Sequence, residues 1–260
     1  DTEGGFERMA LIKCENVSIG YEGQTIVRDL NFEIGQGDYL CIVSENGSGK
    51  STLVKSLLGL KAVDSGKIEF GDGLKQKEIG YLPQQNDFQK DFPASVYEVV
   101  LSGRLNSRGF RPFYTATDKA EAAEKMEMLG ITDLRGQCFR DLSGGQKQRL
   151  SIARAIAKHP DIYIFDDSFS ALDYKTDVTL RAALKEKTQD STVIIVAQRI
   201  STILHAEQII VLDDGKIAGI GTHKELLKSC DAYYQIASSQ LSEAELARDL
   251  NNENDGKEEA

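Results

Sequence analysis

The stretch DYLCIVSENGSGKSTLVKSLLGL, residues 38–60, contains the strongest structural signal in the sequence. An apolar run precedes a turn with two glycines, and a helical pattern follows the turn. Because SENGSGKS, residues 44–51, matches the motif G-x-x-x-x-G-K-[ST] at every position but the first, this order predicts a strand, a phosphate-binding loop and a helix. A glycine- and serine-rich turn that only caps a helix is the alternative.

The residue types of this loop suit the phosphates of a nucleotide. Gly47 and Gly49 allow backbone N–H groups to converge on phosphate oxygens, the helix N-terminus adds a favourable dipole, and Lys50 supplies positive charge. Ser51 is placed to coordinate Mg²⁺. Ser44 replaces the first glycine of the motif; its side chain either narrows the backbone choices of the loop or is harmless, if the required angles suit any residue. The predicted binding residues of the loop are Ser44, Asn46, Gly47, Ser48, Gly49, Lys50, Ser51 and Thr52.

Composition sets the broad limits on function. With 260 residues, 40% of them hydrophobic, the chain can bury a core as one large domain or two small ones. Aliphatic runs such as VIIVA, residues 193–197, are far shorter than the roughly 20 residues that span a bilayer, so we expect membrane contact only through a partner. A net charge of −10 argues against a nucleic-acid partner. The four scattered cysteines suggest neither a zinc site nor a disulfide framework and favour reduced thiols in the cytosol.

The order of strand-like and helical segments predicts an α/β protein. Apolar, β-branched segments such as residues 161–166, 191–197 and 208–215 alternate with helical patterns, which is typical of a parallel sheet. Residues 95–130 are mostly helical in pattern and indicate an insertion. The expected fold is a P-loop NTPase core: a mostly parallel sheet with helices on both faces, an antiparallel β subdomain and an inserted α-helical subdomain.

Both ends of the sequence are expected to lie outside this fold. Residues 1–8 have no apolar core of a signal peptide and read as a cloning remnant before Met9. From Leu241 onward, seven acidic residues stand against two basic ones, which predicts that residues 241–260 form a disordered tail.

Two further motifs extend the nucleotide hypothesis. Asp166 follows the apolar run IYIF, so it is expected at the end of a buried strand, where a carboxylate can hold Mg²⁺ through water beside the phosphates. A hydrophobic run that ends in aspartate is weak support by itself. It gains weight from the rare string LSGGQ, residues 142–146, which ends 20 residues before Asp166.

The phosphate loop, LSGGQ and FDDSFSALD, residues 165–173, together resemble the ATPase domain of ATP-binding cassette (ABC) transporters over roughly residues 10–235. The resemblance implies an ATP-binding domain at residues 9–240, with a helical subdomain at about 90–155, and Mg²⁺ and ATP as ligands. It also implies that two such domains dimerise head to tail, so that each ATP lies between one phosphate loop and the other domain's signature. A membrane-spanning transporter subunit would hold the domain on the cytoplasmic face.

The resemblance assigns further roles by position. Tyr21 looks like the aromatic residue that stacks on adenine, and Gln84 looks like the glutamine that senses Mg²⁺ and the attacking water. Asp173 would close the dimer loop. An ordinary strand-end tyrosine and a solvated turn glutamine are the alternatives for Tyr21 and Gln84. The signature residues that would meet the γ-phosphate across the dimer are Ser143, Gly144, Gly145 and Gln146.

The sequence departs from active members of the family at two catalytic positions. Asp167 stands where they have the glutamate that polarises water, and Gln198 stands where they have a histidine that touches the γ-phosphate. Aspartate is one methylene shorter, and glutamine carries no positive charge. We therefore expect ATP binding with weak or no hydrolysis, as in the degenerate half of heterodimeric ABC exporters. The alternative is that both residues work in this lineage.

The two halves of the sequence resemble different branches of the family. Residues 9 to about 140 are similar to the stand-alone ATPase subunits of metal-ion importers, and residues after about 150 are similar to exporter ATPase domains. This contrast suggests an engineered chimera joined near the signature, or an importer subunit with a divergent second half. A noncatalytic nucleotide-binding module without a transport role is the competing function, and a nucleic-acid or ribosome partner is disfavoured by the acidity.

Overall fold

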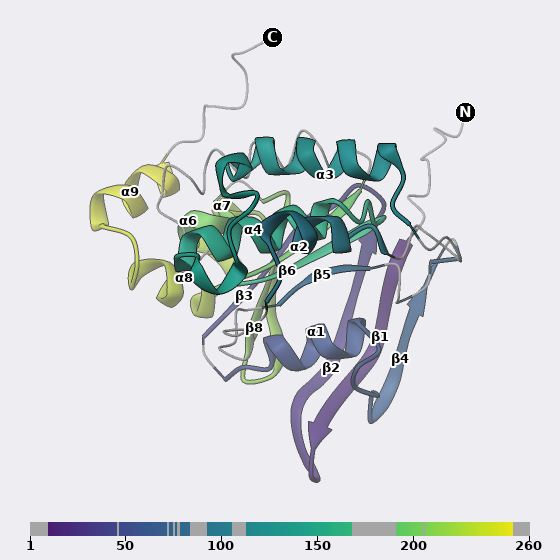
Figure 1. The fold of residues 1–260 in the computed structure, drawn as a ribbon. Coiled ribbons are helices and arrows are strands. Elements are labelled where there is room, and N and C mark those ends of the chain that lie inside the picture. The colour runs from purple at the N-terminus through teal and green to yellow at the C-terminus, as the bar shows by residue number, and fades with distance from the viewer. Residues whose placement is uncertain are drawn as a thin grey trace, which may run out of the picture. The chain divides into compact units, whose positions relative to one another are not determined.

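The computed structural model describes residues 10–45, 47–71, 73–74, 76, 79–83, 93–105, 113–167, 191–204 and 206–251. The chain forms two compact units, one from residues 1–76 and 194–260 and the other from residues 77–193. Figure 1 shows the elements of both units as a ribbon. The phosphate loop belongs to the first unit, whereas Asp166 and the LSGGQ segment belong to the second.

The first unit contains an antiparallel sheet with the strand order β2, β1, β4. These strands are β1 (Ala10–Tyr21), β2 (Gln24–Gly35) and β4 (Ser65–Phe70). The side chains of residues 30–34 in β2 are alternately buried and exposed, which is the two-residue period of a strand with one face on the core. This sheet is the antiparallel β subdomain that the sequence predicted.

A second group of strands in the first unit carries the phosphate loop. β3 (Tyr39–Ser44) pairs in parallel with β8 (Gln208–Asp213), and β8 pairs antiparallel with β9 (Lys216–Gly221). Every residue of β3 after Tyr39 is buried, as expected for a parallel strand with both faces covered. Helix α1 (Lys50–Leu57) follows the loop and packs against β1, β2 and β3 (Figure 1). The predicted succession of strand, loop and helix is confirmed.

Four described helices complete the first unit. They are α6 (Ile200–Ile203), α7 (His223–Ser229), α8 (Asp231–Ser238) and α9 (Glu243–Asn251). Helix α9 overturns the expectation of disorder from Leu241 for the part of the tail that it occupies.

The physical reason for this helix lies in features that net charge does not reveal. Ser242 accepts a hydrogen bond from the backbone N–H of Glu245, whose carboxylate accepts one from the backbone N–H of Ser242, so the helix starts with a reciprocal cap. Leu246 is buried to 6% exposure and anchors the helix on its neighbours. Residues 252–260 lie outside the described residues.

The second unit combines a parallel strand pair with helices. β5 (Gly80–Leu82) pairs in parallel with β6 (Ile162–Asp166). Helices α2 (Val96–Ser102), α3 (Ala116–Met128) and α4 (Gly144–Ile156) pack against one another, and α4 also contacts β5. These helices lie in the stretch predicted as a helical subdomain.

Shorter elements join these parts. Two single turns of 3-10 helix, Thr132–Leu134 and Phe139–Asp141, connect α3 to α4. Strand β7 (Thr192–Ala197) is fully buried and spans the boundary between the two units. The mixture of parallel strands, helices and one antiparallel sheet confirms the predicted α/β class. Every helix in the described part of the chain is too short or too polar to traverse a bilayer.

Candidate nucleotide-binding site

The backbone of the phosphate loop requires glycine at two positions. Gly47 has φ 87° and Gly49 has φ 100°, both in the region that side chains disfavour. A Cβ atom at Gly49 would also lie 2.5 Å from Cγ2 of Val27, which is too close for a carbon contact. At Gly47 a Cβ would meet nothing within 4 Å, so only the backbone angle requires glycine there.

Helix α1 begins without a side-chain cap. Its N-cap residue is Gly49, and among the described residues no side chain caps this end by a hydrogen bond. Helices α2, α3, α4 and α7 each start with a reciprocal capping box, whereas α6 and α8, like α1, start without a side-chain cap. The first N–H groups of a helix have no partner within the helix and carry positive partial charge. The start of α1 therefore suits a phosphate, as the motif predicted.

The ammonium group of Lys50 lies over the beginning of the loop. Its Nζ donates to the carbonyl oxygen of Ser44 at 2.9 Å, to the hydroxyl Oγ of Ser44 at 2.6 Å and to the carbonyl oxygen of Glu45 at 2.8 Å. Lys50 is buried to 9% exposure, so its charge is held inside the loop. The sequence predicted the charge of Lys50 but not this contact with Ser44.

The departure of Ser44 from the motif causes no backbone strain. Ser44 is the last residue of β3 and is absent from the residues with positive φ. Any residue can adopt such a strand conformation, so the serine does not narrow the backbone choices of the loop. The hydroxyl of Ser44 also hydrogen-bonds to Ser48, and Ser48 donates to the carbonyl oxygen of Glu45 at 3.0 Å.

The remaining predicted loop residues are less informative. Ser51 is exposed on the first turn of α1 and Thr52 is half-buried, whereas Asn46 lies outside the described residues. A hydroxyl at Ser51 fits a Mg²⁺ ion that takes its other ligands from phosphates and water. Within the described ranges no three His, Cys, Asp or Glu side chains gather into a metal site.

In the second unit, Asp166 occupies the predicted end of a buried strand. It is 6% exposed, and its Oδ2 accepts a hydrogen bond from the hydroxyl of Tyr81 at 3.2 Å. Burial, followed by the charge of Asp166, raises the pKa of Tyr81, so its hydroxyl keeps its proton at neutral pH. The sequence did not single out Tyr81; its place two residues before Pro83, in the string YLPQQ, was the available signal. Gln84 itself lies outside the described residues.

Asp167 has a backbone conformation that suits its residue type. Its φ is 47°, in the left-handed region that aspartate and asparagine tolerate better than most residues. Its side chain is half-buried. Asp173, predicted to close the dimer loop, lies outside the described residues.

The signature segment forms the beginning of α4. The Ser143 hydroxyl accepts a hydrogen bond from the backbone N–H of Gln146, and the Gln146 side chain accepts one from the backbone N–H of Ser143 at 2.8 Å. Ser143 and Gly144 are exposed, and a Cβ at Gly144 would meet nothing within 4 Å. The spacing S-x-x-Q is a capping-box signal that the sequence interpretation overlooked.

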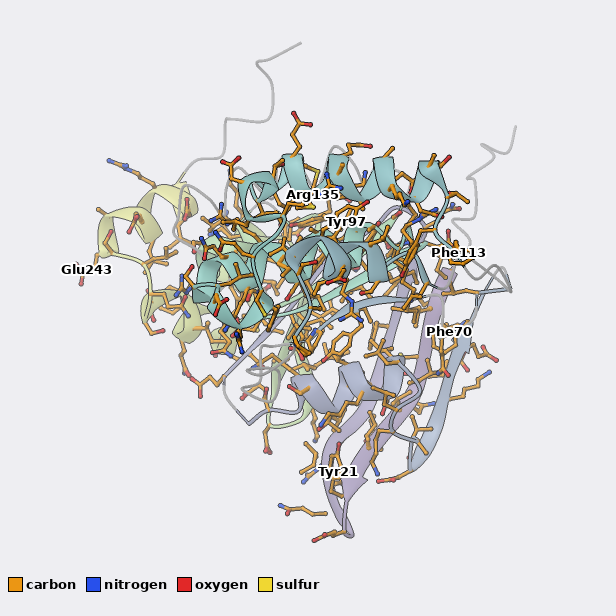
Figure 2. All side chains as sticks on the ribbon, viewed as in Figure 1. Tyr21, Phe70, Tyr97, Phe113, Arg135 and Glu243 are labelled. Atoms are coloured by element: carbon orange, nitrogen blue, oxygen red, sulfur yellow. The ribbon has the colours of Figure 1, made fainter. Side chains whose placement is uncertain are left out.

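Tyr21 lies at the end of β1, beside the hairpin turn that leads into β2 (Figure 2). Its side chain is 42% exposed, and the ammonium of Lys61 lies 4.7 Å from the centre of its ring. An exposed aromatic face can stack on a base, and the Lys61 contact uses part of that surface. The adenine-stacking role therefore stays a prediction.

Gln198 follows β7 and is half-buried in the first unit. The Gln240 side chain donates to the Gln198 carbonyl oxygen at 2.8 Å and accepts from the backbone N–H of Ile200 at 2.9 Å. These two hydrogen bonds fix the backbone around Gln198 and do not involve its side chain.

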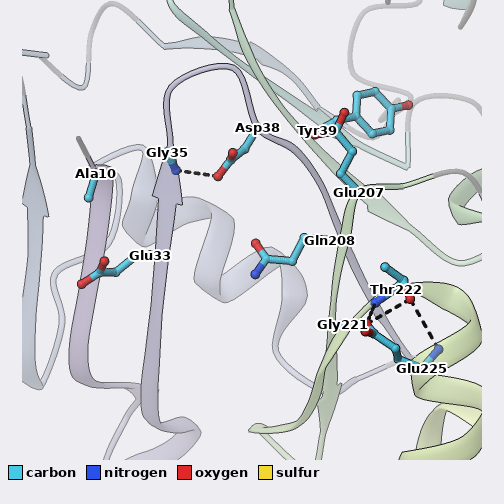
Figure 3. A pocket seen from close by; sticks show the side chains of 10 residues that line it. All are labelled: Ala10, Glu33, Gly35, Asp38, Tyr39, Glu207, Gln208, Gly221, Thr222 and Glu225. Atoms are coloured by element: carbon cyan, nitrogen blue, oxygen red, sulfur yellow. Dashed lines mark hydrogen bonds between the residues drawn. The ribbon is translucent and has the colours of Figure 1, made fainter. Parts of the chain in front are cut away.

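A pocket elsewhere in the first unit has the wrong charge for a nucleotide. It encloses about 450 Å³ and its wall includes the carboxylates of Glu33, Asp38, Glu207 and Glu225 (Figure 3). Asp38 accepts a hydrogen bond from the backbone N–H of Gly35 at 2.6 Å, so part of this acidity serves the local fold. Carboxylates repel phosphates, so this pocket does not suit a nucleotide.

Anion-binding geometry at the start of α1, with a strand-end aspartate and the LSGGQ segment in the same chain, is the arrangement of P-loop ATP-binding domains. Residues 27–170 match the family model described as "ABC transporter". The chain belongs to the ABC transporter family, and it is an ATP-binding domain of that family. The prediction drawn from its motifs is confirmed.

Two curated relatives show the range of this similarity. The chain is 37% identical over 243 residues to an uncharacterised ABC transporter ATP-binding protein of Mycobacterium bovis, covering 88% of this chain and 41% of that protein. It is 34% identical over 240 residues to an ATP-dependent lipid A-core flippase of Acinetobacter baylyi, covering 89% and 42%. The chain thus spans about two fifths of the length of these relatives.

Two solved ABC transporter structures share the fold. A bacterial Atm1-family ABC exporter with ATP bound gives a TM-score of 0.79 at 28% identity, over 90% of this chain and 43% of that chain. A metal-chelate type ABC transporter in an inward-facing conformation gives a TM-score of 0.74 at 29% identity, over 87% of this chain and 89% of that chain. Both alignments extend over most of the chain, so the suggested chimera stays a hypothesis.

Proposed function

We propose that the chain binds Mg·ATP at residues 44–52 and acts as the nucleotide-dependent motor domain of a membrane transporter. The single observation that carries the proposal is the uncapped start of α1 behind a glycine loop that holds Lys50. Backbone N–H groups would bind the phosphate oxygens and Lys50 would neutralise their charge. Ser51 and Asp166 would hold Mg²⁺, which when bound neutralises charge on the β- and γ-phosphates.

A second ATPase domain would complete the site. The exposed start of α4, with Ser143 and Gly144 at its tip, has the accessibility that contact with another domain's nucleotide requires. In such a head-to-tail pair, ATP would join two domains that do not join without it. The energy of this closure would reach a membrane-spanning subunit, on whose cytoplasmic face the domain would lie. That assembly is typical of the family, and the long relatives named as flippases and exporters are in keeping with it.

Slow turnover is the second part of the proposal. A general base must lie about 3 Å from the proton that it removes, and Asp167 is one methylene shorter than the usual glutamate. Gln198 can donate a hydrogen bond but cannot carry the charge of an imidazolium. Loss of a positioned base costs about 10²- to 10⁴-fold in rate. The chain would therefore hold ATP for long periods, and a heterodimer with an active partner would suit it.

The test measures phosphate release with Mg·ATP beside the binding of fluorescent ATP. Wild type is compared with the Asp167→Glu, Gln198→His double variant. Because glutamate is placed at a positive φ in this variant, Asp214→Glu serves as a matched control: Asp214 has φ 43° in the turn between β8 and β9. A Lys50→Ala variant checks that the signal depends on the loop.

We expect wild type and the Asp214→Glu control to bind ATP without measurable turnover and the double variant to regain turnover. Brisk phosphate release by wild type would refute the slow-turnover part while leaving nucleotide binding intact. Failure of wild type to bind ATP would refute the proposal as a whole.

A noncatalytic nucleotide-gated module is the second candidate function, and the Asp167 and Gln198 substitutions favour it. ATP-dependent pairing without any turnover, unchanged in the double variant, would select it. A chimera of importer and exporter domains predicts in addition that the chain stimulates no transporter of either type.

A further inference from the structure

We propose that the hydroxyl of Ser44 competes with the phosphates of a nucleotide for Lys50, so that this serine weakens binding of nucleotides that carry β- and γ-phosphates. The inference rests on the proposed function, because it concerns the same loop. It gives the one position that departs from the loop motif a chemical role.

The donors of Lys50 are already engaged within the chain. An ammonium group has three N–H donors. Three acceptors lie 2.6–2.9 Å from Nζ: the carbonyl oxygens of Ser44 and Glu45 and the hydroxyl of Ser44. A phosphate oxygen that pairs with Lys50 must therefore replace one of them.

The hydroxyl is the acceptor that can be replaced. The two carbonyl oxygens belong to the backbone at the end of β3, where the parallel pairing of β3 with β8 extends to Ser44 itself. The hydroxyl, in contrast, leaves Lys50 by rotation about a single side-chain bond. A glycine at this position, as in the motif, would remove the hydroxyl as a competing acceptor for Lys50 and keep the two carbonyls.

The competition is reinforced by the neighbours of Ser44. Its hydroxyl lies 3.1 Å from the carbonyl oxygen of Glu45 and hydrogen-bonds to Ser48. Ser44 is only 4% exposed, so water replaces these partners poorly when the side chain turns away. Breaking the contact with Lys50 thus disturbs a small network and not one hydrogen bond alone.

The expected change in nucleotide affinity follows from the net free energy of one hydrogen bond. Removing the competitor should tighten ATP and ADP binding about three- to tenfold, the equivalent of one net hydrogen bond. AMP should be unaffected, since the competition concerns the lysine that meets the outer phosphates and AMP lacks them. The effect should also require Lys50.

The experiment compares ATP, ADP and AMP binding by calorimetry or competition, in EDTA so that Mg²⁺ does not contribute. The variants are Ser44→Ala and Ser44→Gly, which remove the hydroxyl, and Ser44→Thr, which keeps one. Ser229→Ala is the matched control, because it removes a serine hydroxyl from the exposed end of α7. Melting temperatures with and without ATP are recorded for each protein.

Tighter ATP and ADP binding in Ser44→Ala and Ser44→Gly, with AMP unchanged, would support the inference. The variants should then melt lower without nucleotide, because Lys50 loses a partner, yet gain a larger upward shift from ATP. A serine with a purely structural role would lower the melting temperature without enlarging that shift. Equal or weaker ATP binding in both variants would refute the inference while the proposed function stands. If neither wild type nor any variant binds ATP, the proposed function fails and takes this inference with it.

Discussion

The hydroxyl of Tyr81 donates a hydrogen bond to Oδ2 of Asp166 over 3.2 Å, and so joins β5 to the strand that presents the carboxylate proposed to hold Mg²⁺. In the parallel register Tyr81 stands opposite Ile164, two residues before Asp166. Side chains two residues apart on a strand point to the same face, which explains why the two polar groups meet.

This contact predicts that Tyr81 orients Asp166 for Mg²⁺. Tyr81→Phe removes only the hydroxyl and should raise the Mg²⁺ concentration needed for half-maximal enhancement of ATP binding by about tenfold, as for other partners of metal-binding carboxylates. ATP binding in EDTA should not change. Tyr163→Phe is the control: Tyr163 lies on β6, the strand of Asp166, but its ring stacks on Phe165. An unchanged Mg²⁺ requirement in Tyr81→Phe would show that the contact is only structural.

The loop geometry predicts unequal costs for its two glycines. Gly49→Ala combines a positive φ with a Cβ placed 2.5 Å from Val27, and should lower the free energy of unfolding by about 2–4 kcal/mol. Gly47→Ala has the angle without the clash and should cost about 1 kcal/mol. Urea unfolding of both variants tests this. Equal losses would mean that Val27 moves aside freely, and adding Val27→Ala to Gly49→Ala would then recover nothing.

Much of this loop could be predicted from the sequence, because the motif is contiguous in the chain and each glycine is required by the φ angle at its own position. The Tyr81–Asp166 contact could not, since it depends on the register of two strands separated by 79 residues (Leu82 to Ile162). Helix α9 was missed for another reason: acidic composition describes the solvent-facing side of a helix and hides a single buried residue such as Leu246. The Ser44–Lys50 contact required side-chain positions.

The lowered pKa of Asp118 leads us to expect that the second unit loses stability in acid. Hydrogen bonds from the side chain and then the backbone of Thr115, aided by Arg104, lower the pKa of Asp118 from 3.8 to about 2. Because the folded pKa lies below the unfolded one, the stabilisation is complete above about pH 4 and is lost as pH falls toward 2. The difference in melting temperature between wild type and Asp118→Asn should therefore shrink between pH 5 and pH 2.

The control for this titration is Asp133→Asn, which changes an exposed carboxylate of the same unit. Its melting temperature should stay close to that of wild type at each pH. A difference between wild type and Asp118→Asn that is constant with pH would mean that Asp118 acts by packing and not by charge.

Two hydrogen bonds of His223 hold α9 in the first unit. His223 is 5% exposed; its Nδ1 lies 2.6 Å from the hydroxyl of Tyr233 on α8, and its Nε2 lies 3.2 Å from Oδ2 of Asp249 on α9. Asp249→Ala should speed amide hydrogen exchange across α9 while leaving β3 and β8 protected, because it removes the contact that holds α9 without opening the core.

Tyr233→Phe leaves the buried Nδ1 of His223 without this partner and should lower the free energy of unfolding by about 1–3 kcal/mol. Glu243→Gln, at the exposed start of α9, should do neither. Fast amide hydrogen exchange of α9 in wild type would instead support the disordered tail that the acidic composition suggests. A helix held by His223 and a disordered segment differ in exchange rate by orders of magnitude.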